Sequence, residues 1–239
     1  MLLLADLGEG VGDEESLIPL LDAGAISCGA HAGDEATISQ TIQRCVAYGV
    51  KIGAHPSFED RSNFGRSEQI LSADGLRDLL LGQLDLFQQW ANSMGARVQF
   101  VKPHGALYNL SARDRVVARV VAETIYSIDP GWALVGLAGS VSVSEAKAVG
   151  LSTLSEAFAD RRYESATALC SRTDPRALLN TSEEAVEQVK SLVEGGGLRS
   201  VHGDFVSLAA EVVCVHGDSE QAVSIARALR TYLKGRSDA

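Results

Sequence analysis

The stretch Val98-Gln99-Phe100-Val101-Lys102-Pro103-His104-Gly105-Ala106-Leu107-Tyr108-Asn109 shows how this chain is built. Its first residues, Val98–Val101, form a short apolar run, which is typical of a buried strand. A cation, a histidine, a phenol and an amide follow directly after that run. The loops after parallel strands carry the active sites of α/β barrels. The order of residues therefore predicts a strand that delivers functional groups to a barrel rim.

The same order recurs along the chain, where short apolar runs alternate with longer amphipathic segments. Strands are expected at Leu2–Ala5, Ala25–Cys28, Val50–Gly53, Val98–Val101, Ala133–Leu137, Thr153–Ala157 and Glu211–Val215. Helices are expected at about 13–22, 34–48, 73–94, 112–128, 141–149, 182–194 and 219–233. This alternation predicts parallel strands joined by right-handed crossovers.

No Pro/Ser-rich linker interrupts these units, which favours a closed barrel over an open doubly wound sheet. Periodicity alone does not separate the two arrangements. We predict an α/β fold, a single (β/α)7-type barrel domain over residues 1–239, with a small β-hairpin near 198–208.

Composition narrows the class of protein. The chain has 239 residues, with 21 basic against 31 acidic side chains and a formal net charge of −10. This balance argues against nucleic acid or a membrane surface as a partner. No apolar run approaches the roughly 20 residues of a membrane span, and the amino terminus does not resemble a signal peptide. The four cysteines form no Cys-x-x-Cys pair, which fits a reducing compartment. We therefore expect a cytoplasmic protein with a small-molecule substrate.

Polar side chains that carry chemistry gather at the expected strand ends. These candidates are Asp6, Glu9, His31, His55, Lys102, His104, Tyr108, Asn109, Asp160, Arg161 and His216. Four of the five histidines lie at such ends, and the fifth, His202, lies in the expected hairpin turn, where a structural role is favoured. In a barrel, these ends converge on one rim.

Lys102 is the most informative of these residues because it is a cation placed directly after an apolar strand. It is expected to point into the barrel mouth, where it could neutralise a carboxylate or phosphate, or stabilise a developing oxyanion. On this interpretation, Lys102→Met abolishes turnover and leaves thermal stability nearly unchanged. The alternative is a structural salt bridge to Asp6 or Glu9.

Several blocks of sequence, in order and spacing, resemble the LamB/YcsF family. They are Asp6-Leu7-Gly8-Glu9, Cys28-Gly29-Ala30-His31-Ala32-Gly33-Asp34, Ile52-Gly53-Ala54-His55-Pro56, Phe64-Gly65-Arg66, Val101–Asn109, Glu156-Ala157-Phe158-Ala159-Asp160-Arg161 and Cys214-Val215-His216-Gly217-Asp218. The Lys102–Asn109 and Cys214–Asp218 strings are long enough to be specific. The chain departs from the family at Leu2 and Leu4, where the family usually has Asp and Asn.

The resemblance implies a fold and an activity. The fold is a barrel of the glycoside hydrolase/deacetylase superfamily, with seven strands in this family. The activity is that of the A subunit of a bacterial 5-oxoprolinase, which works with B and C subunits. That enzyme opens the lactam of 5-oxo-L-proline to L-glutamate with ATP as co-substrate.

The resemblance also implies roles for the candidate residues. The catalytic group is Asp6, Glu9, His55, Lys102 and His104, in which His55 or His104 is the base. Substrate or phosphate binding falls to His31, Arg66, Tyr108, Asn109, Asp160, Arg161 and His216. The chain has no Gly-x-x-x-x-Gly-Lys-Ser/Thr string, so ATP would need a different kind of site or help from the partner subunits.

Two other functions stay open at this point. One is a metal-dependent amide or deacetylase-type hydrolase that needs no ATP, acting on a small carbohydrate-like or cyclic-amide substrate. It would hold a divalent ion through Asp6 or Glu9 with His31 and His55. The other is a non-catalytic subunit that binds a small acid, which the leucines at positions 2 and 4 keep open. A homo-oligomer is compatible with each of these functions.

Overall fold

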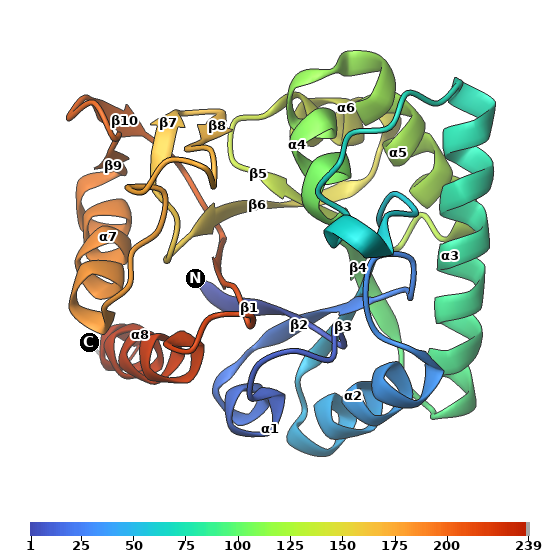
Figure 1. Cartoon of the computed structure of the whole chain (residues 1–239), viewed down its shortest axis with the longest axis horizontal. Helices are drawn as coiled ribbons and strands as arrows, with labels where there is room; N and C mark the ends of the chain where they lie inside the picture. Colours follow the sequence, from blue (N-terminus) through green and yellow to red (C-terminus); the bar gives the residue numbers. More distant parts are fainter. Residues whose placement is uncertain (238–239) are drawn as a thin grey trace.

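A closed barrel of parallel strands forms the centre of the computed structural model, which describes residues 1–237 (Figure 1). Its strands are β1 (Leu2–Leu7), β2 (Ala23–Ser27), β3 (Lys51–His55), β4 (Val98–Val101), β5 (Ala133–Leu137), β6 (Ser152–Phe158) and β11 (Val212–Val215). They close in the order β1-β11-β6-β5-β4-β3-β2. The predicted seven-stranded α/β barrel is therefore confirmed within the described residues.

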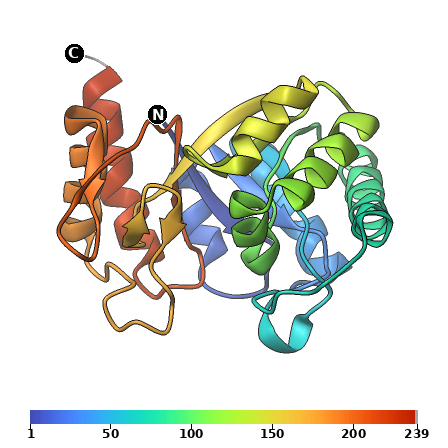
Figure 2. The same ribbon diagram turned by 90° about the horizontal axis from the view of Figure 1, so that it is seen from above.

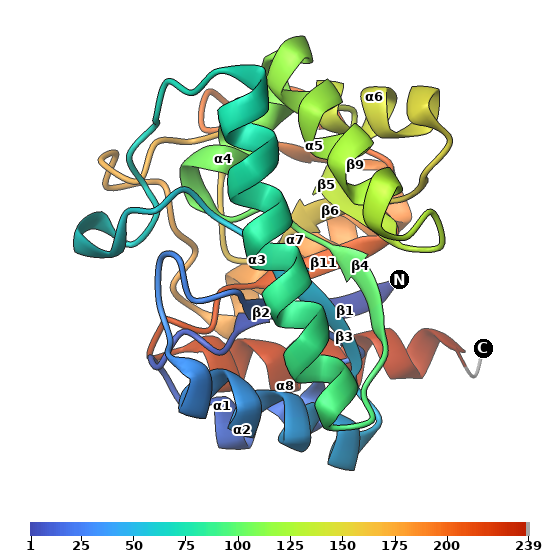
Figure 3. The same ribbon diagram turned by 90° about the vertical axis from the view of Figure 1, so that its right-hand side faces the viewer.

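Helices cover the outside of the barrel, as parallel crossovers require. They are α1 (Glu14–Leu17), α2 (Glu35–Tyr48), α3 (Ala73–Ser93), α4 (Gly105–Arg113), α5 (Arg115–Ile128), α6 (Val141–Val149), α7 (Ser182–Gly195) and α8 (Ala222–Ser237). Helices α7 and α8 pack side by side at one flank of the barrel (Figure 2). The long helix α3 crosses the outer side of the barrel and packs on α5 (Figure 3). No helix within residues 1–237 is long and apolar enough to cross a bilayer.

The apolar core lies in two regions, one on each side of the barrel wall. The larger lies between the wall and the helices, and the smaller fills the barrel interior with residues such as Leu4, Phe100, Phe158 and Cys214. Successive side chains of a strand point to opposite faces, so Leu4 and Asp6 share the inward face of β1. Leu4 is completely buried. The interior around Leu4 is therefore apolar apart from Glu156, an inward-facing carboxylate of β6, and the other polar groups lie at the rim.

The structure corrects several predicted elements. The helix expected at 112–128 is present as α5, and it is preceded by a separate helix that was not predicted, α4, which begins at Gly105 directly after His104. The break lies at Asp114, whose side chain accepts hydrogen bonds from Val116 N and Val117 N and so starts α5 as its N-cap. The helix expected at 13–22 is only the short α1 and a 3-10 turn (Ile18–Leu20) that contains a proline.

Two small antiparallel hairpins lie outside the barrel. The hairpin predicted near 198–208 is present as β9 (Gly197–Arg199) and β10 (Phe205–Ser207). A second hairpin, β7 (Tyr163–Ser165) and β8 (Ala168–Leu169), was not predicted and lies after β6. The segment that follows β8 reaches over the carboxyl end of the barrel, where its residues help to line the cavity described next.

Candidate active site

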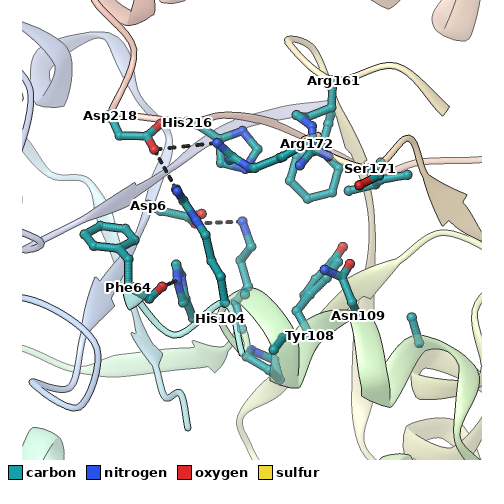
Figure 4. Close-up of a pocket in the computed structure, with 18 of the residues that line it drawn as sticks. Asp6, Phe64, His104, Tyr108, Asn109, Arg161, Ser171, Arg172, His216 and Asp218 are labelled. Carbon is teal, nitrogen blue, oxygen red and sulfur yellow. Dashed lines mark hydrogen bonds and ion pairs between the residues drawn. The ribbon is translucent and has the colours of Figure 1, made fainter. Parts of the chain in front are cut away.

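A cavity of about 720 Å³ opens at the carboxyl ends of the barrel strands. Figure 4 shows His216, Arg161 and Arg172 on one side of it and Tyr108 and Asn109 on the other. Ten of the twelve predicted site residues line it: Asp6, Glu9, His55, Arg66, Lys102, His104, Tyr108, Asn109, Arg161 and His216. The remaining two, His31 and Asp160, lie buried behind residues that line it.

A buried ion cluster forms the floor of the cavity. Lys102 Nζ lies 2.7 Å from Asp6 Oδ1 and 2.9 Å from Glu156 Oε1, and it is 3.2 Å from Cys214 Sγ. Tyr108 donates its hydroxyl hydrogen to the other oxygen of Glu156 at 2.7 Å. Burial alone would raise the pKa of Asp6, but Lys102 and then His55 hold it well below its usual value. Asp6 is therefore ionised and fixed in place.

These contacts bear on the two interpretations of Lys102. The salt bridge to Asp6, one of the alternatives drawn from the sequence, is present, and Glu156 adds a second acceptor. A lysine between two buried carboxylates contributes strongly to stability whatever its role in turnover. The expectation that Lys102→Met leaves thermal stability unchanged therefore has to be revised.

Beside this floor, Glu9 and three histidines pack into one buried cluster. His31 Nε2 lies 2.9 Å from Glu9 Oε1, and His55 Nε2 lies 2.9 Å from His104 Nδ1. Glu9 Oε1 is also 3.5 Å from His104 Nδ1 and 4.0 Å from His55 Nε2. The four residues follow or end four neighbouring strands, β1 to β4, so the closed barrel brings them together.

Hydrogen bonds at the back of two rings assign their tautomers. His55 Nδ1 donates to the Lys102 carbonyl at 2.6 Å, and His104 Nε2 donates to the Phe64 carbonyl at 2.9 Å. In the neutral rings, the lone pairs of His55 Nε2 and His104 Nδ1 then face each other. Burial, and then His55 and His31, hold the pKa of His104 well below its usual value.

The other two members of the cluster are also shifted towards their neutral forms. Burial, and then His55, lower the pKa of His31 to about 3. Burial, and then the nearby Asp6, raise the pKa of Glu9 well above its usual value. One ligand atom from each of the four residues lies within 4.8 Å of all the others. The cluster is therefore a possible metal-binding site.

Four arginines and two acidic residues line the cavity above its floor: Arg66, Arg113, Arg161 and Arg172, with Glu68 and Asp218. Arg113 pairs with Glu68. Arg66 and Arg172 both reach Asp218, at 2.9 Å and 3.7 Å. Arg161 is buried and donates to the Cys170 carbonyl at 2.6 Å. Burial, and then the neighbouring Arg172, lower the pKa of Arg161 to about 10. More positive than negative charge therefore faces the cavity mouth, which suits an anionic substrate or a phosphate.

Asp160 lies behind the cavity wall and holds His216, which lines the cavity. Its carboxylate accepts a hydrogen bond from His216 N at 2.8 Å and lies 3.0 Å from His216 Nδ1. The His216 ring stacks on Phe158 with 5.2 Å between the ring centroids. These contacts fix the His216 ring and leave its other edge to the cavity.

A sequence model of the LamB/YcsF family matches residues 1–238. The chain belongs to the LamB/YcsF family. It is 41% identical over 232 residues to the A subunit of the 5-oxoprolinase of Histophilus somni strain 129Pt, covering 97% of this chain and 94% of that protein. Its structure resembles that of a lactam utilization protein from Thermus thermophilus, with a TM-score of 0.91 and 33% identity. That match covers 99% of this chain and 97% of the other.

In this LamB/YcsF chain, sequence reasoning missed five residues of the site: Phe64, Glu156, Arg172, Cys214 and Asp218. Glu156 carried a usable signal, because it is the one charged residue in the strand Ser152–Phe158. Asp218 lies before α8, which begins at Ala222, and it pairs with two arginines at the cavity mouth. Arg172 arrives on the segment after β8, which was not predicted.

The LamB/YcsF departures at Leu2 and Leu4 lie away from the cavity. Leu4 is buried in the apolar interior of the barrel, and Leu2 packs against the same group of residues. Neither is among the described residues that line the cavity. The two leucines therefore change the packing below the site and leave the polar rim intact.

The loop that carries Phe64 requires glycine at position 65. Gly65 has a φ of +67°, and an added Cβ would lie 2.3 Å from Ser57 Oγ and 2.8 Å from His104 Cδ2. Gly65→Ala is expected to lower the melting temperature and the activity together, because it moves the loop whose carbonyl holds His104.

Gly49→Ala is the matched control, since Gly49 also has a φ of +67° but nothing lies within 4 Å of the added Cβ. Thermal denaturation and turnover are measured for both variants. The effect of Gly49→Ala gives the cost of a side chain at positive φ, and any further effect of Gly65→Ala comes from the steric clash with Ser57 and His104. Equal effects in the two variants would show that the packing around Gly65 does not matter.

Proposed function

We propose that this LamB/YcsF chain is the A subunit of an ATP-dependent 5-oxoprolinase, which hydrolyses the lactam of 5-oxo-L-proline to L-glutamate. The observation that carries the proposal is the cavity floor, where a buried lysine–carboxylate cluster adjoins Glu9 and three histidines. The names of the relatives from Histophilus somni and Thermus thermophilus support the choice of a lactam as substrate.

The chemistry explains why ATP and a polar rim are both needed. A lactam carbonyl is a poor electrophile, and phosphorylation of its oxygen makes the ring carbon open to water. One ATP and two water molecules then give glutamate, ADP and phosphate. The site must supply a base for water, cations for phosphate and donors for the developing oxyanion.

The residues at the floor of the cavity supply the base for water and the positive charge for the developing oxyanion. The lone pairs of His55 Nε2 and His104 Nδ1 can take a proton from water directly or hold a cation that acidifies it. Lys102 is held by Asp6, whose carboxylate also lies 3.5 Å from His55 Nε2, and it provides positive charge near the carbon under attack. Glu9 orients His31 and His104.

The residues at the cavity mouth bind the charged parts of the substrate. Arg66 and Arg161 supply positive charge for the substrate carboxylate or a phosphate, joined by Arg172 from the segment after β8. On the opposite wall, Asn109 supplies an amide for hydrogen bonds to the substrate, and Tyr108 lies beside it with its hydroxyl held by Glu156. Asp160 acts as a positioning residue, because it contacts His216 and not the cavity.

ATP and the partner subunits belong to the same proposal. Because the sequence has no P-loop string, we assign nucleotide binding to a site completed by the B and C subunits. The name of the Histophilus somni relative, which is an A subunit, supports a complex of several subunits. We place the enzyme in the cytoplasm and treat residues 1–239 as one domain, of which residues 238–239 lie outside the described part.

A second candidate function is a metal-dependent amide hydrolase that needs no ATP. The arrangement of Glu9 with three histidines favours it, since such a set can hold an ion and activate water without a nucleotide. The third possibility, a non-catalytic subunit that binds a small acid, was based on the leucines at positions 2 and 4. Those leucines do not line the cavity, so they no longer favour it.

A substrate panel separates the two catalytic functions. The chain is assayed with matching B and C subunits on 5-oxo-L-proline, other cyclic amides and N-acetylated sugars, each with and without ATP. The proposal expects product from 5-oxo-L-proline only when ATP is present. ATP-independent release of acetate, with no product from any cyclic amide, would replace it with the second function.

A further inference from the structure

The orientation of the histidine lone pairs requires a positive charge at the centre of the cluster. His55 Nε2 and His104 Nδ1 are only 2.9 Å apart, and both rings donate their N–H groups elsewhere, to backbone carbonyls. Two facing lone pairs at hydrogen-bond distance repel each other unless a proton or a metal ion lies between them. A shared proton would satisfy only this pair, whereas Glu9 Oε1 and His31 Nε2 converge on the same place.

We propose that Glu9, His31, His55 and His104 bind one divalent transition-metal ion through Glu9 Oε1, His31 Nε2, His55 Nε2 and His104 Nδ1. Metal binding by the cluster stands independently of the substrate, but its use to activate water rests on the proposed function. The site differs from the ligand set expected from the sequence, because His104 joins it and Asp6 does not.

The spacing of the ligand atoms fits a single ion. Atoms about 2.1 Å from a common ion are about 3.0 Å apart at a right angle and about 4.2 Å apart when opposite. The separations of 2.9 Å (His55–His104 and His31–Glu9), 3.5 Å and 4.0 Å lie close to this range, and all four atoms lie within 4.8 Å of one another. Small side-chain movements would bring all four to ligand distance from one ion. Near-right angles leave coordination positions for water or substrate. Glu9, His55 and His104 line the cavity, so those positions face it.

Asp6 is not expected to be a metal ligand, because it is already paired with Lys102. Its carboxylate lies 3.5 Å from His55 Nε2, but Lys102 Nζ lies 2.7 Å from it and holds it as an ion pair. An ammonium group so close to a metal ion would repel it. Asp6 is therefore a neighbour of the site that balances Lys102.

The donor set selects the class of metal. Imidazole nitrogens suit zinc, cobalt, iron and nickel, whereas magnesium prefers carboxylate and water oxygens. With three imidazoles and one carboxylate, we expect Zn²⁺ or Co²⁺ to bind and Mg²⁺ to bind weakly. The carbonyls of Lys102 and Phe64 hold two of the rings in the orientation that ligation needs. His31 Nδ1 has no hydrogen-bond partner within the described residues, so His31 should be the weakest of the three histidine ligands.

The test uses the purified full-length chain without substrate, ATP or partner subunits. Chain stripped with a chelator is titrated with Zn²⁺, Co²⁺ or Mg²⁺ in a calorimeter, and bound metal is measured after dialysis by mass spectrometry. The Co²⁺ form is also examined for visible absorption. We expect about one Zn²⁺ or Co²⁺ per chain, a Co²⁺ spectrum typical of nitrogen and oxygen ligands, and no comparable Mg²⁺ binding.

Variants locate the site. His55→Asn combined with His104→Asn should weaken Zn²⁺ binding by on the order of 100-fold or more, and His31→Asn should weaken it less. His202→Asn, which changes an exposed histidine on the β9–β10 hairpin turn, should bind like the unchanged chain. Circular dichroism checks that each variant folds, and if the double variant does not fold, Zn²⁺ stoichiometry and the Co²⁺ spectrum of the unchanged chain decide.

Two results would overturn the proposal: an unchanged chain that retains no Zn²⁺ or Co²⁺, or a folded double variant that binds as tightly as the unchanged chain. Either result would leave the lactam assignment standing, because that assignment is tested by product formation. Conversely, a chain that binds one metal ion but never forms glutamate would confirm the metal site and contradict the assignment of 5-oxo-L-proline as substrate.

Discussion

Lys102→Met should lower the free energy of unfolding by about 3–5 kcal/mol, because it leaves Asp6 and Glu156 buried without their shared cation. A loss of this size corresponds to a fall in melting temperature of roughly 6–20 °C for a chain of this length. Glutamate formation should be lost as well, since the cation beside the reacting carbon is removed. Thermal denaturation and reconstituted turnover measure the two effects.

The stability loss should also depend on pH. The pKa of Asp6 is depressed in the folded chain, so its ion pair stabilises above the unfolded pKa of about 4 and is lost as pH falls through the folded pKa. In Lys102→Met, the carboxyl groups of Asp6 and Glu156 have lost their shared cation, and protonation at acid pH removes the cost of burying their unpaired charges. The difference in stability between the two chains should therefore be largest near neutral pH and shrink at acid pH.

A second substitution separates stability from catalysis. Adding Glu156→Gln to Lys102→Met removes one of the unpaired charges and should recover part of the lost stability without recovering turnover. Lys190→Met, which changes an exposed lysine on α7, should alter neither. A Lys102→Met chain as stable as the unchanged one would show that the buried ion cluster does not hold the barrel together.

Glu9→Gln should reduce glutamate formation by at least about 100-fold while leaving the melting temperature nearly unchanged. Glu9 Oε1 contacts His31 and His104 and lies 4.0 Å from His55 Nε2. An amide of the same shape can neither release a proton nor supply a carboxylate oxygen to a cation, so it removes both roles of Glu9 at this point. Because burial already raises the pKa of Glu9, the neutral side chain costs little stability.

Glu220→Gln provides the comparison for Glu9, since Glu220 is an exposed carboxylate between the site and α8. The rate of glutamate release by enzyme reconstituted with each variant is the measurement, and the control should retain full activity. If the Glu9→Gln variant formed glutamate at a rate within threefold of that of the unchanged chain, Glu9 would have no catalytic role.

The barrel was predictable because its signals are local. Each strand is a short apolar run followed by polar residues, and parallel strands must deliver those residues to the same rim. Val98–Val101 and Ala133–Leu137 have the bounds that the pattern predicted. Helix α4 was missed because it starts at Gly105, inside a string that also reads as a loop, and β7–β8 has too short a pattern to be recognised.

The site was predictable in its members but not in its pairings. The sequence placed Asp6, Lys102 and the histidines at strand ends, yet their partners come from strands distant in the chain. Lys102 meets Glu156 because β4 and β6 both contribute inward-facing side chains to one narrow interior. The tautomers of His55 and His104 depend on backbone carbonyls that only the folded loops bring into reach.

The most direct test of the lactam assignment is glutamate release from 5-oxo-L-proline by this chain mixed with matching B and C subunits and ATP. Each component is omitted in turn. We expect release with all components present, and none when ATP or this chain is left out. Release that continues without this chain, or no release under any condition, would contradict its role as the A subunit.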